Sequence, residues 1–73
     1  MNRQRIIRLS RCINETCRLP HDMLVSIVRA GDRYSPLFRA AALRHIVAEA
    51  PLSVTGGRPF AERRRAVRQF YQL

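Results

Sequence analysis

The sequence predicts an all-α fold, a compact small domain of three to four helices, and three features lead to this prediction. Apolar residues recur mainly at steps of three and four positions, the spacing of one helix face. Prolines and glycines divide the chain into segments of helical length. The 73 residues suffice for a single domain, residues 1–73, without internal repeats. A domain this small buries only roughly 60% of the surface of its unfolded chain, so we expect marginal stability.

The first predicted helix runs from Arg3 to about Arg18. Its apolar stripe consists of Ile6, Leu9, Ile13 and Cys17. An extended N-terminal segment over residues 5–13 is the alternative, because Ile7, Leu9 and Ile13 also fit an alternating pattern and the stretch is rich in β-branched residues.

The next two helices are delimited by turn and capping residues. A second helix is predicted from about Pro20 to Ala30, ended by Gly31. Its core face would consist of Met23, Leu24, Ile27 and Val28. Ser35 and Pro36 form an N-cap and first-turn pair, which predicts a third helix to about Ala50. This helix is apolar around most of its circumference, interrupted by Arg39, Arg44, His45 and Glu49, and is therefore expected to be central.

The stretch LSVTGGRP is predicted to be a loop, because Gly56 and Gly57 permit positive φ. Pro59 would then start a fourth helix that runs to near the C-terminus. On that helix Phe60, Val67 and Tyr71 share one stripe, and Phe70 flanks it.

The chain is strongly basic, and arginine supplies all of its positive side-chain charge. There are 14 arginines, no lysines and five acids, for a formal net charge of +9. Such a charge predicts an anionic partner: nucleic acid, an acidic protein face or a membrane surface. Arginine suits bidentate recognition of phosphate, although a GC-rich genome produces the same bias. No apolar run approaches the ~20 residues that span a bilayer, so we expect a cytoplasmic protein without a membrane partner.

The densest arginine cluster lies in and before the predicted fourth helix. Its members are Arg58, Arg63, Arg64, Arg65 and Arg68. Three consecutive arginines fan over roughly 200° of a helix, so at least two must be exposed. We expect this cluster to bind nucleic-acid phosphates, with Tyr71 or Phe70 available to stack on an unpaired base. The alternative is a solvated face near Glu62, with both aromatic residues in the core.

A second candidate surface is the N-terminal stretch RQRIIRLSR. Its candidate partner-binding residues are Arg5, Ile7, Arg8 and Arg11. Ile7 lies off the main apolar stripe and could enter a groove of a partner while the arginines meet acidic side chains. The alternative is a core helix with a solvated outer face.

Catalysis and metal binding find little support in the sequence. Cys12 and Cys17 are expected to be reduced, half-buried structural thiols, since a disulfide between them would distort a helix. His21 and His45 are too far apart for the usual zinc spacing. His45 is expected to be a packing histidine, and no serine or cysteine has a convincing base partner. We therefore expect a non-enzyme with no cofactor and no metal.

Two resemblances bear on function. The stretches IRLSRC and AAALRHIVAE are loosely similar to the Hha-like nucleoid modulators, whereas the GG-containing loop and the stretch ERRRAVRQF depart from that family. In chain length, lysine-free arginine composition and absence of catalytic groups, the chain resembles the small phage-encoded regulators of host bacterial RNA polymerase.

The phage resemblance implies a transcription regulator that binds RNA polymerase, inhibits initiation and promotes antitermination near the RNA exit channel. The N-terminal stretch would contact polymerase, and Arg58 to Arg68 would contact RNA or the acidic mouth of the channel. The alternatives are a DNA-binding repressor of helix-turn-helix type and a phage inhibitor that plugs an acidic site on another host protein. The loop before the fourth helix is longer than the turn of a DNA-binding helix-turn-helix, which argues against the repressor.

Overall fold

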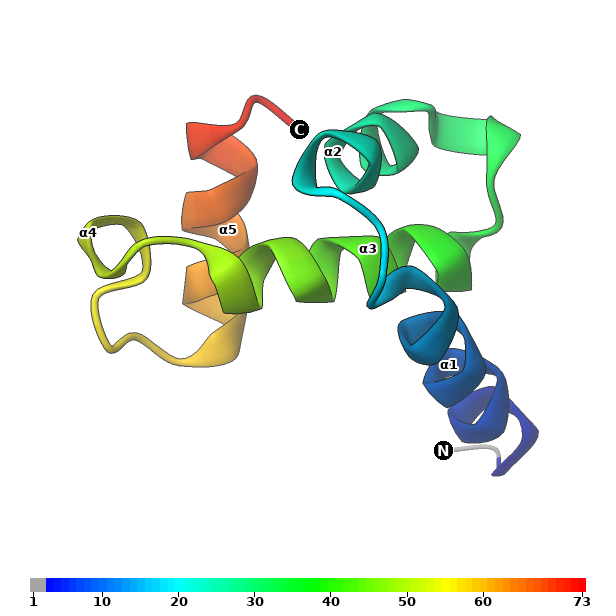
Figure 1. Ribbon diagram of the computed structural model, residues 1–73. Helices are drawn as coiled ribbons and strands as arrows, with labels where there is room; N and C mark the ends of the chain where they lie inside the picture. The colour runs from blue at the N-terminus through cyan, green and yellow to red at the C-terminus, as the bar shows by residue number, and fades with distance from the viewer. Residues whose placement is uncertain (1–2) are drawn as a thin grey trace.

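A computed structural model describes residues 3–73 and confirms the all-α prediction. The elements in chain order are α1 (Arg3–Thr16), α2 (His21–Arg29), the 3₁₀ turn η1 (Gly31–Arg33), α3 (Pro36–Glu49), α4 (Leu52–Thr55) and α5 (Phe60–Phe70). No strand occurs within residues 3–73. Helix α3 runs through the middle of the molecule, and α1, α2 and α5 all pack against it, while the N-terminal end of α1 points away from the other helices (Figure 1).

Helix α1 is helical throughout residues 3–16, so the extended alternative for residues 5–13 is wrong. The helix is fixed by packing against α3, where the His45 ring donates a hydrogen bond from Nε2 to the carbonyl oxygen of Ile13 at 2.8 Å. Thr16 is fully buried, and its hydroxyl donates to the carbonyl oxygen of Cys12 at 2.7 Å. This internal partner allows a polar residue to be buried without an unmade hydrogen bond.

The buried face of α1 is therefore rotated from the predicted stripe. Leu9 and Ile13 of the predicted stripe are half-buried as expected, and Thr16 and the half-buried Cys12 join them, whereas Cys17 is exposed and Ile6 is 48% exposed. Ile7, in the first two turns of α1, is 50% exposed, and the N-terminal end of this helix lies away from the other helices (Figure 1). The prediction that Ile7 is exposed is confirmed, and Ile6 joins it.

Helix α2 has the predicted bounds to within one residue and buries Leu24 and Ile27. Met23, which was expected in the core face, is exposed, and Val25 is half-buried instead. Gly31 follows the helix with φ +59°, a left-handed conformation that favours glycine and ends the helix as predicted.

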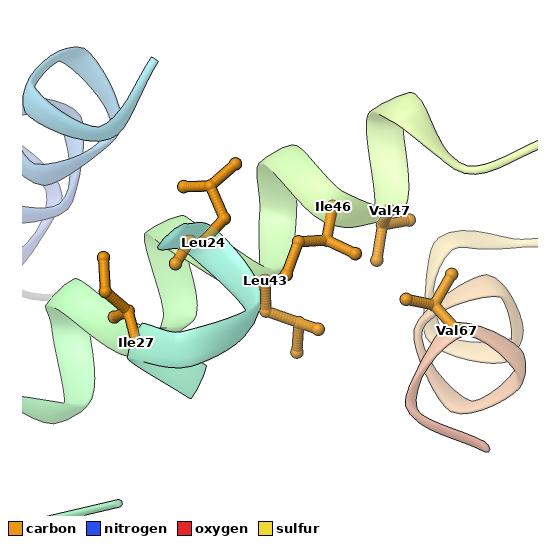
Figure 2. Close-up of a cluster of buried hydrophobic side chains, with 7 residues drawn as sticks. Leu24, Ile27, Leu43, Ile46, Val47 and Val67 are labelled. Atoms are coloured by element: carbon orange, nitrogen blue, oxygen red, sulfur yellow. The ribbon is translucent and has the colours of Figure 1, made fainter. Parts of the chain in front are cut away.

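Helix α3 is the central helix, as its all-round apolar sequence predicts. Its buried residues are Ala41, Ala42, Leu43, Ile46 and Val47. Four of them, Ala42, Leu43, Ile46 and Val47, belong to the core, and Figure 2 shows side chains converging there from α2, α3 and α5. Its labelled members are Leu24, Ile27, Leu43, Ile46, Val47 and Val67.

The Ser35 N-cap of α3 is confirmed, because its hydroxyl oxygen accepts a hydrogen bond from the Phe38 backbone N–H at 3.2 Å. We expect Ser35→Ala to lower the free energy of unfolding by about 0.5–2 kcal/mol, the usual contribution of such a cap. Urea denaturation would measure the loss. Ser10→Ala is the matched control, since Ser10 is exposed on α1 and makes no side-chain hydrogen bond; an equal loss in both variants would contradict the capping role.

The stretch predicted to be a loop begins with the single helical turn α4 instead. Pro51 precedes this turn, and the Thr55 hydroxyl donates to the Pro51 carbonyl oxygen at 3.4 Å. Thr55 is buried, which adds tertiary packing to a segment whose sequence favours a loop. The turn ends at Gly56 with φ +49°, and Gly57 also has positive φ, as predicted for this pair.

Helix α5 begins directly after Pro59, as predicted, and Val67 is its one fully buried residue. Tyr71, just after the helix, is half-buried, so this part of the predicted stripe holds. Phe60 is 40% exposed and Phe70 is 60% exposed. The C-terminal end of the predicted stripe is therefore packed against the rest of the molecule, whereas Phe60 at its other end is partly exposed to solvent.

Candidate nucleic-acid interface

The fourteen arginines are not neutralised within the molecule. All of them lie in residues 3–73, and none has a carboxylate oxygen within 4.0 Å. The one ion pair in this part of the chain joins His21 Nδ1 to Glu49 Oε2 at 3.7 Å. All the arginines except the half-buried Arg39 and Arg63 are exposed. The positive potential therefore acts on whatever approaches the surface.

Three arginines converge on one pocket of about 200 Å³ between α3 and α5. Arg64 and Arg68 lie one turn apart on the same side of α5, and Arg39 faces them from α3. The Nε of Arg39 donates to the carbonyl oxygen of Tyr34 at 3.3 Å, which orients this guanidinium. The remaining lining residues are Val28, Pro36, Ala40 and Leu43. We call this site the arginine pocket.

A second pocket of about 190 Å³ adjoins the first, where α1, α3 and α5 meet. Its lining residues are Leu9, Ala40, Leu43, Arg44, Phe60 and Arg64. The guanidinium carbons of Arg44 and Arg63 each lie 5.6 Å from the centre of the Phe60 ring, within the range of cation–π attraction. We call this site the aromatic pocket; it shares Ala40, Leu43 and Arg64 with the arginine pocket.

The structure separates the arginines that the sequence groups together. Arg64 and Arg68 line the arginine pocket, whereas Arg58 and Arg65 line a hollow on another side of α5, beside Glu62. Arg63 is half-buried, and its Nε has no hydrogen-bond partner among the described residues. The expectation that at least two of the three consecutive arginines are exposed is confirmed by Arg64 and Arg65.

Sequence reasoning missed Arg39 and Arg44 as site residues. Both lie on α3, ten or more residues from the basic cluster in the sequence, and the fold brings them to it. The one signal that could have found them is their charge on a helix that is otherwise nearly all apolar.

The N-terminal candidates form a neighbouring basic surface. Arg5 and Arg8 line a pocket of about 360 Å³ against the start of α3, and Arg11 is exposed. Ile7 is 50% exposed on the same helix but does not line this pocket. Pro36 lines both this pocket and the arginine pocket, so the two basic surfaces adjoin.

Neither C-terminal aromatic residue lines the arginine pocket or the aromatic pocket. The Tyr71 ring lies 5.1 Å from the His21 ring of α2, and an Arg29 guanidinium donates to the Tyr71 carbonyl oxygen. Tyr71 therefore holds the end of α5 against α2. Phe70 lines an apolar hollow between α4 and α5.

The histidines and cysteines are dispersed among helices. In residues 3–73 no group of three or more His, Cys, Asp or Glu side chains is placed to hold a metal ion. His45 is the packing histidine that was expected, bonded to α1. Cys12 is half-buried as expected, but Cys17 is exposed and donates from Sγ to the Asn14 carbonyl oxygen at 2.9 Å, which corrects the expectation for Cys17.

No helix among the described residues has the length and apolar character needed to cross a membrane. Comparisons of the chain with protein-family models, with curated proteins and with solved structures give no match.

Proposed function

We propose that the protein is a non-catalytic regulator that binds nucleic-acid phosphates through the arginine pocket. The observation that carries the proposal is the convergence of Arg39, Arg64 and Arg68 on one pocket with no carboxylate in its lining. A guanidinium matches the geometry of a phosphate and can donate two parallel hydrogen bonds to it. The pocket can therefore engage a phosphate from two helices at once.

We propose that this binding regulates transcription. Helix α1 docks on bacterial RNA polymerase, and the arginine pocket takes the transcript near the RNA exit channel, which inhibits initiation and promotes antitermination. Two features support it: the resemblance to the phage regulators, and the presence of two adjoining basic surfaces of different character. Helix α1 carries two exposed isoleucines as well as exposed arginines, as suits a protein partner, whereas the arginine pocket is lined by three arginines.

A helix-turn-helix repressor fits the geometry less well. The connection from α3 to α5 spans residues 50–59 and contains α4. A DNA-binding helix-turn-helix joins its helices with a turn of about three or four residues.

Affinity capture from bacterial lysate, with and without nuclease, tests the proposal against its alternatives. Recovery of RNA polymerase after nuclease treatment supports it. Recovery of DNA without polymerase favours a repressor, and recovery of a different single host protein favours an inhibitor that plugs an acidic site; either result contradicts the polymerase proposal.

The role of α1 is tested by reversing two of its charges. We expect Arg8→Glu combined with Arg11→Glu to weaken binding to purified RNA polymerase by roughly tenfold or more, because like charges then oppose docking. Both side chains are exposed, so the fold should be retained, which circular dichroism would check.

Arg18→Glu combined with Arg33→Glu is the matched control, since both residues are exposed and the change in net charge is the same. Equal weakening in the two double variants would indicate a dependence on net charge alone, and would remove α1 from the polymerase interface.

A further inference from the structure

We infer that the aromatic pocket receives the base of an unpaired nucleotide whose phosphate is held in the arginine pocket. This inference rests on the proposed function, and it names the form of nucleic acid that the protein prefers: a single strand or an unpaired loop rather than a continuous duplex.

The first observation is that the two pockets are adjacent. Ala40, Leu43 and Arg64 line both of them. In a nucleotide the phosphate and the base are joined through one sugar, so a ligand of this class presents an anionic group and a flat apolar group at neighbouring positions. A phosphate bound by Arg64 and Arg68 would bring its own base, or that of the next nucleotide, to the aromatic pocket.

The second observation is the chemistry of the aromatic pocket. Leu9, Ala40 and Leu43 give it an apolar floor, and the Phe60 ring is 40% exposed at its wall. The guanidiniums of Arg44 and Arg63 each lie 5.6 Å from the centre of that ring, and of the two only Arg44 lines the pocket, where it adds a second flat group with a positive charge. Aromatic rings and guanidinium planes are the two kinds of surface on which proteins stack unpaired bases.

The third observation is the size and polarity of the pocket. Its volume of about 190 Å³ equals that of roughly six water molecules, enough for a flat heterocycle. Its side chains include donors on Arg44 and Arg64 but no hydrogen-bond acceptor of the Asn, Gln, Asp or Glu type. A base would therefore be held mainly by stacking on its flat face. Since all bases have such a face, we expect binding to tolerate different sequences. A base inside a duplex is stacked and paired, and cannot enter.

The test compares two fluorescent oligonucleotides of the same length, one with normal bases and one in which abasic spacers keep the phosphates but remove the bases. We expect the protein to bind the normal strand more tightly. Phe60→Leu should weaken binding of the normal strand by about 5- to 150-fold, the usual contribution of one stacked base, and should leave binding of the abasic strand unchanged.

Two variants make the result specific. Phe70→Leu removes an aromatic ring from the same helix, 60% exposed and outside both pockets, and should change neither affinity. Phe60→Tyr retains the ring face and should restore the preference for the normal strand, which a variant that merely disturbed the fold would not do.

Equal loss of affinity for both strands in Phe60→Leu would overturn the inference, as would equal binding of the two strands by the unmodified protein. The proposed function survives either of those results as long as both strands bind with the expected salt dependence. Failure of the protein to bind any nucleic acid would overturn the proposed function itself.

Discussion

Replacing Arg64 and Arg68 together with glutamine is expected to reduce the slope of log affinity against log salt by about 1.8 on duplex DNA and about 1.4 on a single strand. Each arginine that neutralises a phosphate releases counterions, and both side chains line the arginine pocket. The loss should be similar across unrelated sequences, because phosphate contacts position a protein without reading bases. Fluorescence anisotropy at several salt concentrations would measure the slope.

Arg58→Gln combined with Arg65→Gln is the matched control for this measurement. It removes the same charge from the same region of the chain, but from a hollow that contains Glu62 and lies outside the arginine pocket. We expect its slope to stay within a few tenths of a unit of the unmodified protein's. If the slope falls by the same amount in both double variants, phosphates bind along the whole basic surface of α5 and the arginine pocket is not the binding site. Loss confined to one sequence would favour the repressor.

The fold was largely predictable because its strongest signals are local. Ser35 and Pro36 fix the start of α3, Gly31 ends α2, and the all-round apolar sequence of α3 marks it as the central helix. Each of these depends on backbone geometry or on one helix's own residues.

The orientation of α1 was less predictable. A polar residue can take a buried position beside the apolar stripe when a carbonyl oxygen of its own helix accepts its hydrogen bond. The fully buried Thr16 donates its hydroxyl to the Cys12 carbonyl oxygen of its own helix, so its burial costs little. The pattern of hydrophobicity alone assigned that place to Cys17, which is exposed. Helix α4 was not predicted for a related reason. Thr55 is buried by the packing of the whole chain, which the local sequence does not show.

The candidate site was predictable only in part. The run of arginines from 63 to 65 indicated a basic surface, but neighbours on a helix are about 100° apart, so consecutive arginines must face different ways. The burial of Val67 decides which of them face α3. Arg39 reaches the arginine pocket, and Arg44 the aromatic pocket, through the packing of α5 on α3. A contact between helices of this kind has no signature in the local sequence.

The basic surface lowers the stability of the folded state, and the small core has little burial to offset this. Fourteen arginines without a carboxylate partner repel one another in the folded state, and only one residue of α5 is fully buried. An anion bound between α3 and α5 relieves the repulsion and adds a link between the two helices. By mass action, any ligand that binds only the folded state stabilises it. The stability of the free protein therefore depends strongly on the few side chains at the centre of the core.

Ile46→Ala is accordingly expected to have the largest effect of any single substitution that we propose. Ile46 is 0% exposed and lies in the C-terminal half of α3, in the core that α2, α3 and α5 form together (Figure 2). Truncating a buried isoleucine to alanine lowers the free energy of unfolding by about 2–5 kcal/mol, through lost burial and a residual cavity. Since a chain of 73 residues has a total of roughly 4–11 kcal/mol, the variant should lose a large fraction of its stability.

Urea denaturation followed by circular dichroism would measure this loss, with Leu52→Ala as the control. Leu52 is also an aliphatic residue of a helix, but it is 81% exposed, so its truncation should change the free energy of unfolding by less than about 0.5 kcal/mol. The contrast between the two variants depends on burial alone and needs no knowledge of the ligand. If Ile46→Ala proved no more damaging than Leu52→Ala, the core would not be centred on α3. In that case the arginine pocket and the aromatic pocket, which both depend on α5 packing against α3, would lose their structural basis.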